Sequence, residues 1–293
     1  MGQYIAPPQV PNDETQLLAL GRLLSRQNWN NNRNDFNDYE FKIFSQFGDD
    51  GLIQYLVSNL NIENKTFIEF GVGDYMESNT RFLLMNNNWE GFVMDGSEEN
   101  MNYLKTRSWY WRYNITCKNT FITKSNINDL LEETGLENVG LLHIDLDGND
   151  YFILKELNIK KYNPSILILE YNSLFGIEKS ISTPYKEDFY RTNAHYSNLY
   201  YGASLPALDM LSRKLGYRFV GCNEAGNNAY FVRKDLLNDN VKEANLKEGY
   251  RMSQFRESRN SEGKNTFISG KERIEIIRGL EVLNVETNSI ENI

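Results

Sequence analysis

The chain has 293 residues, 40% of them hydrophobic and 13% aromatic, which is the composition of a globular protein with a sizeable core and one large or two small domains. Its net charge of -9 at pH 7 argues against a nucleic-acid partner, because proteins that bind a phosphate backbone present a basic face. The sequence has two scattered cysteines, Cys117 and Cys222, and shows no amino-terminal secretory signal and no apolar run near the roughly 20 residues of a membrane span. Together these features predict a cytoplasmic protein.

Residues 1–40 are predicted to form a helical extension. Apolar residues recur at helical spacing over 16–24, and an Asn-rich stretch follows. The pattern indicates a surface helix that packs on the rest of the chain, with a contact in a homo-oligomer as the alternative.

Residues 41–235 alternate between helical and strand patterns. We expect helices at 49–60, 78–86, 98–106, 127–133, 151–157 and 205–215, and strands at 66–70, 91–94, 114–117, 139–144, 165–169, 217–222 and 228–232. This alternation is typical of βαβ units in a mostly parallel sheet, and the two successive strands at the end predict an antiparallel edge. Residues 236–293 are polar with helical propensity and are expected to form a cap or lid.

A glycine turn follows the first strand of this pattern. The strand ends in Glu69, and Gly71 and Gly73 come directly after it. Such a turn at the carboxyl edge of an α/β sheet makes room for a nucleotide-like ligand. The next strand ends in Asp95, near the spacing at which an acidic side chain meets a ribose diol, so an adenosine-containing cofactor is predicted.

Acidic residues also end the two later strands. Asp145 and Asp147 follow one of them, and Glu170 and Asn172 end the next. Carboxylates at one sheet edge repel each other and lose solvation, so a cation or a hydrogen-bonding ligand is expected among them. We assign helix capping to Asp150, and an all-oxygen Mg²⁺ or Mn²⁺ site to Asp145, Glu170 and Asn172. With only two histidines and two cysteines, a zinc site is not expected.

The two histidines occupy different contexts. His143 lies within an apolar strand and is predicted to be a buried structural residue. His195 lies in a polar, tyrosine-rich loop, where an imidazole could accept a hydroxyl proton near neutral pH. Asp147 and His195 are therefore the candidates for the general base.

A series of motifs in this order resembles the FkbM-like class I methyltransferases that use S-adenosylmethionine, in particular those of bacterial surface-polysaccharide (capsule) clusters. The motifs are Phe44–Gly51, Phe67–Asp74, Ser78–Arg81, Val93–Gly96, Ile144–Asp150, Ile168–Gly176, Tyr201–Ser204 and Gly221–Arg233. The likeness covers residues 41–235. It implies a Rossmann-like, seven-stranded, mostly parallel sheet with an antiparallel last strand.

The resemblance also implies roles for single residues. Glu69, Gly71 and Gly73 would border the methionine part of the cofactor, with Asp145 also beside the cofactor. Asp95, with Gly96 beside it, would hold the ribose hydroxyls, and Ser125 and Asn126 would approach the adenine. Metal-dependent O-methyltransferases of this broad class carry acids or amides where this chain has Asp145, Glu170 and Asn172. Where they often place a base, this chain has Gly148, which leaves Asp147 or His195 for that role.

The sequence therefore predicts an O-methyltransferase that acts on a sugar hydroxyl, with a nucleotide-activated or polysaccharide-linked sugar as substrate. A nucleotide-sugar or NAD-dependent oxidoreductase is the alternative enzyme, although the third glycine of a dinucleotide-binding turn is missing. A non-catalytic nucleotide-binding protein of the same fold is the third interpretation, because a fold alone does not fix activity.

Overall fold

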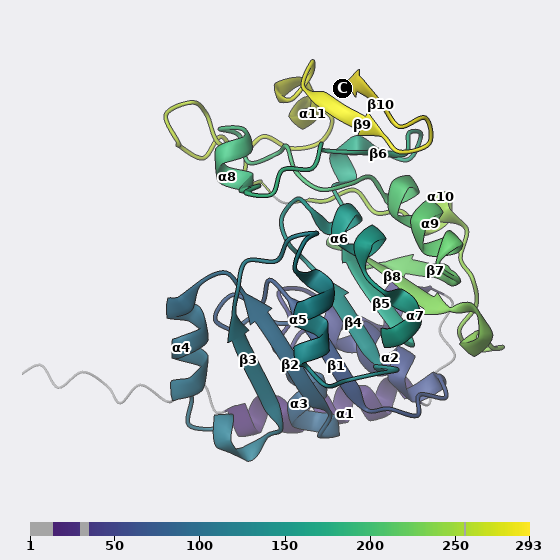
Figure 1. Cartoon of the computed structure of the whole chain (residues 1–293). Coiled ribbons are helices and arrows are strands. Elements are labelled where there is room, and N and C mark those ends of the chain that lie inside the picture. Colours follow the sequence, from purple (N-terminus) through teal and green to yellow (C-terminus); the bar gives the residue numbers. More distant parts are fainter. Residues whose placement is uncertain (1–13, 30–34, 255) are drawn as a thin grey trace, which may run out of the picture.

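The computed structural model describes residues 14–29, 35–254 and 256–293, and its central layer is a seven-stranded sheet with the order β3-β2-β1-β4-β5-β8-β7 (Figure 1). The strands β1 to β5 pair in parallel, whereas β8 is antiparallel to both of its neighbours. The strands are β1 (Thr66–Phe70), β2 (Glu90–Asp95), β3 (Ile115–Asn119), β4 (Leu141–Ile144), β5 (Ile166–Glu170), β7 (Tyr217–Cys222) and β8 (Asn228–Arg233). The predicted α/β fold with an antiparallel last strand is confirmed. The last strand inserts between β5 and β7, so β7 forms the edge.

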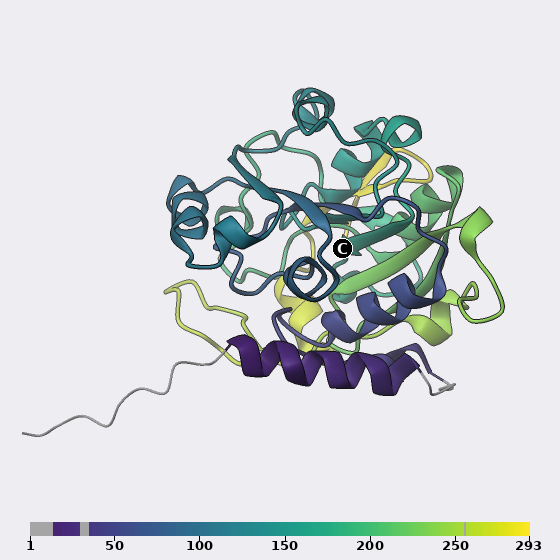
Figure 2. The same cartoon turned by 90° about the horizontal axis from the view of Figure 1, so that it is seen from below.

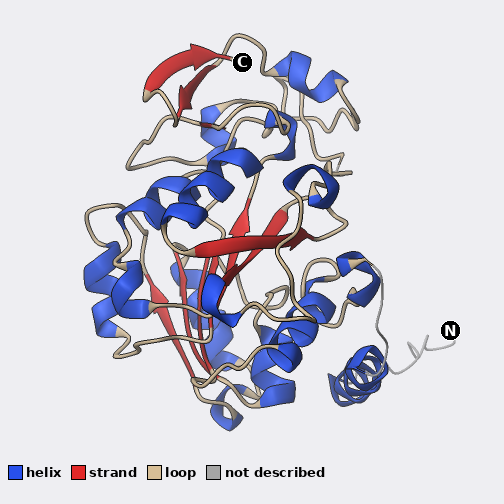
Figure 3. Cartoon of the chain, turned by 90° about the vertical axis from the view of Figure 1, so that its right-hand side faces the viewer, coloured by secondary structure: helices blue, strands red, loops and turns tan. Residues whose placement is uncertain are grey.

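Helices cover both faces of the sheet (Figures 1 and 3). One face carries α2 (Asp49–Asn59), α3 (Arg81–Asn87) and α4 (Glu98–Thr106), and the other carries α5 (Ile127–Glu133), α6 (Asp150–Glu156), α7 (Ile159–Tyr162) and α9 (Leu205–Lys214). In β1, Phe67 packs in the first layer, and Ile68 and Phe70 pack in the second. A strand buried on both faces needs apolar residues at successive positions, which explains the apolar run before Glu69.

The amino-terminal helix α1 (Glu14–Trp29) lies outside the first helical layer, against α2 and α3 (Figure 2). Gly21 is its buried residue, and a Cβ there would stand 2.4 Å from the Phe82 ring. Leu20, Leu23 and Trp29 remain exposed on α1, so the homo-oligomer contact stays a prediction. None of the helices in the described ranges combines the length and the hydropathy needed to cross a membrane.

The carboxyl-terminal segment, expected to be helical, also contains strands. It has the short helices α10 (Leu246–Gly249) and α11 (Glu272–Ile276), and the hairpin β9 (Glu281–Asn284) and β10 (Ser289–Asn292). The hairpin pairs with β6 (Ile181–Ser182) in a second sheet, which lies with α8 (Arg191–Ala194) beyond the carboxyl ends of β4 and β5 (Figure 1). Short 3-10 helices span Phe36–Tyr39, Tyr110–Arg112, Ser173–Phe175 and Lys234–Leu236.

Candidate functional site

The glycine turn after β1 is held tightly between the ends of β2 and β4. Gly71 has a φ of +71°, and a Cβ there would stand 1.8 Å from the Asp145 carbonyl oxygen. Its N–H donates to the Met94 carbonyl oxygen at 2.9 Å. Gly73 has a φ of +54°, and a Cβ there would meet no atom within 4 Å. Gly71 is therefore required by close packing, and Gly73 by its backbone conformation beside open space.

Asp95, at the end of β2, braces this turn. Its Oδ2 accepts from the Gly73 N–H and its Oδ1 from the Ser97 N–H, both at 2.8 Å. A carboxylate has about four acceptor positions, so Asp95 retains capacity for further hydrogen bonds. The structure brings Gly71, Gly73 and Asp95 together, as the sequence predicts.

Glu69 is directed into the protein. It is 2% exposed and accepts hydrogen bonds from Ser78 Oγ at 2.6 Å, from the Thr80 N–H at 3.2 Å and from the Thr80 hydroxyl. His143 Nδ1 lies 3.0 Å from its Oε1. Burial alone would raise the pKa of Glu69, but the hydrogen bonds from His143, Ser78 and Thr80 lower it below the usual value. These bonds hold residues 78–80 outside the helix, so α3 begins at Arg81, three residues later than predicted.

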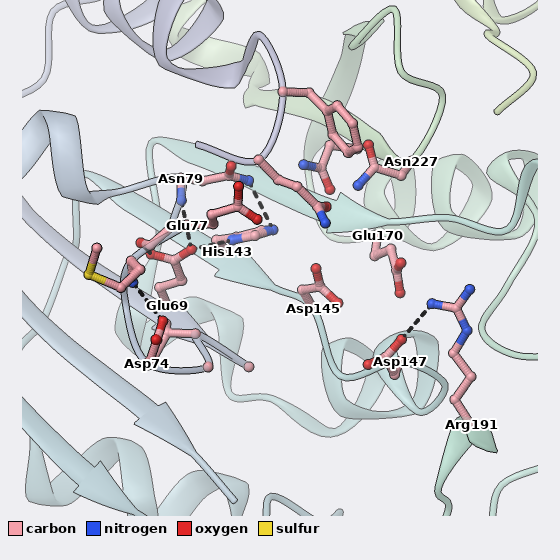
Figure 4. A pocket seen from close by; sticks show the side chains of 18 of the residues that line it. Glu69, Asp74, Glu77, Asn79, His143, Asp145, Asp147, Glu170, Arg191 and Asn227 are labelled. Atoms are coloured by element: carbon pink, nitrogen blue, oxygen red, sulfur yellow. Dashed lines mark hydrogen bonds and ion pairs between the residues drawn. The ribbon is translucent and has the colours of Figure 1, made fainter. Parts of the chain in front are cut away.

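Two adjoining cavities open at the carboxyl edge of the sheet. The larger cavity, of about 740 Å³, extends from Glu69 past Asp145 to Glu170 and Asn228 (Figure 4). The smaller cavity, of about 520 Å³, extends over the ends of β2 and β3. They share Gly71, Gly73, Asp145, Asp147, Arg191 and Glu257. A long ligand in the smaller cavity would therefore reach the larger one across the glycine turn.

The smaller cavity is lined by an aromatic residue, Phe121, that the sequence did not single out. Asp95, Gly96 and Phe121 line it, and the Phe121 side chain is 44% exposed. Ser125 and Asn126, expected near the adenine, line neither cavity. Ser125 Oγ bonds to Thr123 and Glu187, and Asn126 bonds to Phe121 O and the Thr123 N–H. Phe121 could have been found from its position just after the carboxyl end of a strand, because β3 ends at Asn119.

Three carboxyl groups meet at the ends of β4 and β5. One oxygen each of Asp145, Asp150 and Glu170 lies within 4.8 Å of the others. Burial, then the charge of Asp147, raises the pKa of Asp145 to about 7. Burial and the charges of Asp145 and Asp147 raise the pKa of Glu170 well above its usual value. Glu170 Oε2 is buried and has no hydrogen-bond partner among the described residues, so this group can accept a ligand.

Asp150 is in this group, and Asn172 is not. The Asp150 carboxylate accepts from the N–H groups of Leu146 and Gly148, at 2.8 and 3.0 Å, and so closes the turn before α6. Asn172 donates to the carbonyl oxygens of Leu199 and Tyr201, at 2.9 and 3.0 Å, and accepts from the Leu174 N–H at 3.0 Å. Its side chain therefore holds the neighbouring loop segments together, and Asn172 lines neither of the two cavities.

Asp147 stands at the junction of the two cavities (Figure 4). Its φ of +52° places it in the left-handed region, which aspartate tolerates better than most residues. Its Oδ1 accepts from Arg191 Nη1 at 2.8 Å, and Arg191 Nη2 pairs with Glu257. The Arg191 guanidinium also lies 3.8 Å from the centre of the Tyr201 ring. Arg191 begins α8, Glu257 lies in a loop distant in sequence, and no local motif singles them out.

The histidines differ in their distance from the cavities. His195 lines neither of them, and its Nδ1 lies 2.8 Å from Ser197 Oγ. His143 is 3% exposed, as predicted for a buried residue, yet it lines the larger cavity. Burial would lower the pKa of His143, but its hydrogen bond and charge interaction with Glu69 raise it above the usual value. Of the two predicted bases, the structure brings Asp147 to the cavities and not His195.

The sheet order, the antiparallel last strand and the glycine turn at the carboxyl edge define the class: this is the Rossmann-like fold of the class I methyltransferases. Residues 50–219 match the family model described as the methyltransferase FkbM domain. The chain belongs to this family. The predicted membership is thereby confirmed, and the oxidoreductase interpretation is set aside. Among curated proteins, no sequence relative matches the chain.

Three of the solved structures to which this chain is similar overlap with most of its length. A SAM-dependent methyltransferase from Aquifex aeolicus is 13% identical, with 75% of this chain and 98% of that chain covered and a TM-score of 0.37. Magnesium protoporphyrin IX methyltransferase from Synechocystis, with bound S-adenosylhomocysteine, is 12% identical, with 75% and 97% covered and a TM-score of 0.41. The N-terminal domain of EvdMO1 is 10% identical, with 75% and 95% covered and a TM-score of 0.41. At these values they describe a shared arrangement of helices and strands alone.

Proposed function

We propose that this chain is a cytoplasmic S-adenosylmethionine-dependent O-methyltransferase that methylates a sugar hydroxyl in the synthesis of a surface polysaccharide such as a capsule. The observation that carries the proposal is the contact of Asp95 with the Gly73 N–H at the point where the two cavities join. An acidic strand end and a glycine turn thus lie beside a cavity of about 520 Å³, a size typical of small-molecule sites, in a member of a methyltransferase family.

The smaller cavity is the proposed methyl-donor site. Phe121 offers a face for the adenine, and Asp95 retains acceptor positions for the ribose hydroxyls. The methionine part would lie along Gly71 and Gly73, which leads the reacting end toward Asp145 at the junction. Glu69 lines the larger cavity, and its carboxylate is already engaged by residues 78–80 and His143.

The reaction transfers a methyl group from the sulfonium sulfur to the hydroxyl oxygen, while the C–S bond breaks and the hydroxyl proton goes to a carboxylate. Holding the two reactants in line supplies much of the rate, and a base works best with a pKa near the working pH. Asp145, whose pKa is about 7, and Asp147 are the carboxylates at the junction of the cavities. We propose that Asp147 takes the proton when a cation is bound at Asp145, and that either carboxylate can take it when none is bound.

Asp145 and Glu170, with Asp150 beside them, form an oxygen donor set that fits Mg²⁺ or Mn²⁺. The fit rests on the buried Glu170 Oε2 that lacks a partner among the described residues, and on the raised pKa values of Asp145 and Glu170. A bound cation would orient the substrate hydroxyl and lower its pKa. Activity that survives EDTA, together with calorimetry showing no Mg²⁺ or Mn²⁺ binding, would remove the metal from the proposal.

Two measurements test the function. Crystals soaked in S-adenosylhomocysteine should show it between Phe121, Asp95 and Gly73. A sugar panel incubated with methyl-labelled S-adenosylmethionine should yield a labelled O-methyl sugar, and Asp95→Ala should abolish the transfer. Glu99→Gln is the matched control, because it removes one exposed carboxylate from the neighbouring helix α4. Calorimetry without heat for S-adenosylhomocysteine would refute the methyl-donor site.

A further inference from the structure

The larger cavity has a strongly acidic wall. The carboxylates that line it are Glu69, Asp74, Glu77, Asp145, Asp147, Glu170 and Glu257. In the view of Figure 4, Glu170 lies between Asp147 and Asn227, so the half of the cavity beyond the glycine turn is walled by carboxylates and amides. An ionised carboxylate only accepts hydrogen bonds, and a protonated carboxyl group still has acceptor positions beside its single O–H donor, so this half of the cavity offers mainly acceptors to a ligand.

The positive charges at this wall are already engaged. Among the described residues that line the larger cavity, the cationic or titratable basic side chains are Arg191 and His143. Arg191 pairs with Asp147 and Glu257, and His143 pairs with Glu69 at 3.0 Å. Lys42, outside this lining, pairs with Glu77 at 3.3 Å. A phosphate or diphosphate entering this cavity would meet carboxylates without an uncommitted cation to balance it.

Two buried atoms in the wall lack partners, and both can accept hydrogen bonds. Glu170 is 6% exposed and Asn228 is 3% exposed. Glu170 Oε2 and Asn228 Oδ1 have no hydrogen-bond partner in the described part of the chain. A buried polar atom is costly to leave unsatisfied, so a ligand with hydroxyl or amino groups would be favoured at this position.

We infer that the methyl acceptor is a phosphate-free sugar whose hydroxyl or amino groups donate to Glu170 and Asn228, and that nucleotide-activated sugars are excluded from the larger cavity. The inference rests on the proposed function and narrows it to a glycoside or a polysaccharide-linked residue. A divalent cation at Asp145 and Glu170 would leave the charges of Asp74, Asp147 and Glu257 in place, so it would not convert this wall into a diphosphate site.

The test separates this inference from the proposed function. Calorimetry with S-adenosylhomocysteine first establishes whether the methyl-donor site exists. The loaded protein is then titrated with methyl glycosides of neutral and amino hexoses, with pyrophosphate and with UDP, each with EDTA and again with Mg²⁺. We expect binding of at least one glycoside and no heat from pyrophosphate or UDP. Binding of either phosphate compound under either condition, or failure of every glycoside, overturns the inference while leaving the methyl-donor site standing.

A charge variant tests the cause of the exclusion. Glu257→Gln removes one carboxylate from the wall and releases one side of Arg191. The dissociation constant for pyrophosphate should therefore become measurable, at roughly one tenth of the weakest constant that the assay can detect for the native chain. Glu262→Gln is the matched control, because Glu262 is exposed, pairs with Lys264 and lies outside the cavity. The Glu262→Gln control should not bind pyrophosphate. If Glu257→Gln does not bind it either, the carboxylates of the wall do not cause the exclusion of phosphate compounds, and the inference fails.

Discussion

Replacing Gly73 with alanine is expected to weaken cofactor binding substantially while the protein stays folded. Gly73 has a φ of +54°, and its added Cβ would meet no protein atom within 4 Å. An L-residue in the left-handed region costs about 1–2 kcal/mol, which a domain of this size tolerates. Because Gly73 lines both cavities, the methyl group would occupy space proposed for the cofactor. Crowding of about 1–3 kcal/mol corresponds to a roughly 5- to 150-fold loss of affinity for S-adenosylhomocysteine.

Two other glycines separate backbone strain from ligand crowding. Gly135 has a φ of +67°, has open space around its Cβ position and lines neither cavity, so Gly135→Ala should lose a similar stability and bind normally. At Gly71 the Cβ would stand 1.8 Å from Asp145 O. Strain and overpacking together predict a loss of about 2–5 kcal/mol for Gly71→Ala, with displacement of Asp145.

The assay combines denaturant unfolding with calorimetry on the three variants. The expected pattern is a folded Gly73→Ala protein that binds S-adenosylhomocysteine about 5- to 150-fold more weakly, a folded Gly135→Ala protein that binds normally, and a strongly destabilised Gly71→Ala protein. If Gly73→Ala binds S-adenosylhomocysteine as tightly as Gly135→Ala does, the cofactor does not lie against this turn, and the assignment of the smaller cavity is refuted.

Three further outcomes are expected. Phe121→Ala should weaken S-adenosylhomocysteine binding about 10- to 100-fold if adenine stacks there, whereas calorimetry on Trp111→Ala, a change at an exposed aromatic outside the cavities, should show no change. Because the pKa of Asp145 rises from 3.8 to about 7 on folding, the folded chain binds more protons and the unfolding free energy falls as pH rises between these values. The unfolding free energy of Asp145→Asn, relative to that of the native chain, should therefore increase by about 1–3 kcal/mol from pH 4 to pH 8. A relative unfolding free energy that falls over this range would contradict the raised pKa of Asp145. Glu14→Gln should lower the unfolding free energy by about 1–3 kcal/mol, because it leaves the buried Arg81 without its carboxylate partner at 2.6 Å, and unchanged denaturation would show that the pair adds nothing.

The fold was predictable because its signals are local. The core strands are four to six residues long, those at the centre of the sheet are largely apolar, and each is followed by a turn or a helical pattern. Alternation of this kind leaves few topologies, since parallel crossovers are right-handed. The hairpin of β9 and β10 was not predicted, because its strands are four residues each and mostly polar or exposed. Pairing with β6, which is about 100 residues earlier in the chain, defines these strands and has no signal within the segment.

The site residues that were predicted are likewise those with a local signal in the sequence. Asp95 and the glycine turn were predicted, because an acidic residue at a strand end and a glycine pair are visible in a few consecutive residues. Asn172 was assigned to the metal site and Asp150 to a helix cap, but the Asn172 amide is bonded within a loop and Asp150 lies among the three carboxyl groups. The direction of a side chain in a turn depends on which backbone N–H groups lie nearby, and the sequence does not show this. Arg191 was not predicted, because its role depends on Asp147, which is distant in sequence and meets it only in the folded chain.

The contacts around the glycine turn connect the wall of the proposed methyl-donor cavity to the wall of the proposed acceptor cavity. Glu69 fixes residues 78–80 and His143 on β4, while Asp95 on β2 fixes Gly73. Gly71 packs directly on the Asp145 backbone, which continues into the carboxyl group shared by both cavities. A displacement at any of these points would move the cofactor wall and the proposed base together. The spacing of the two reactants is therefore set by packing among β1, β2 and β4, so that alignment does not have to be formed when the substrates bind.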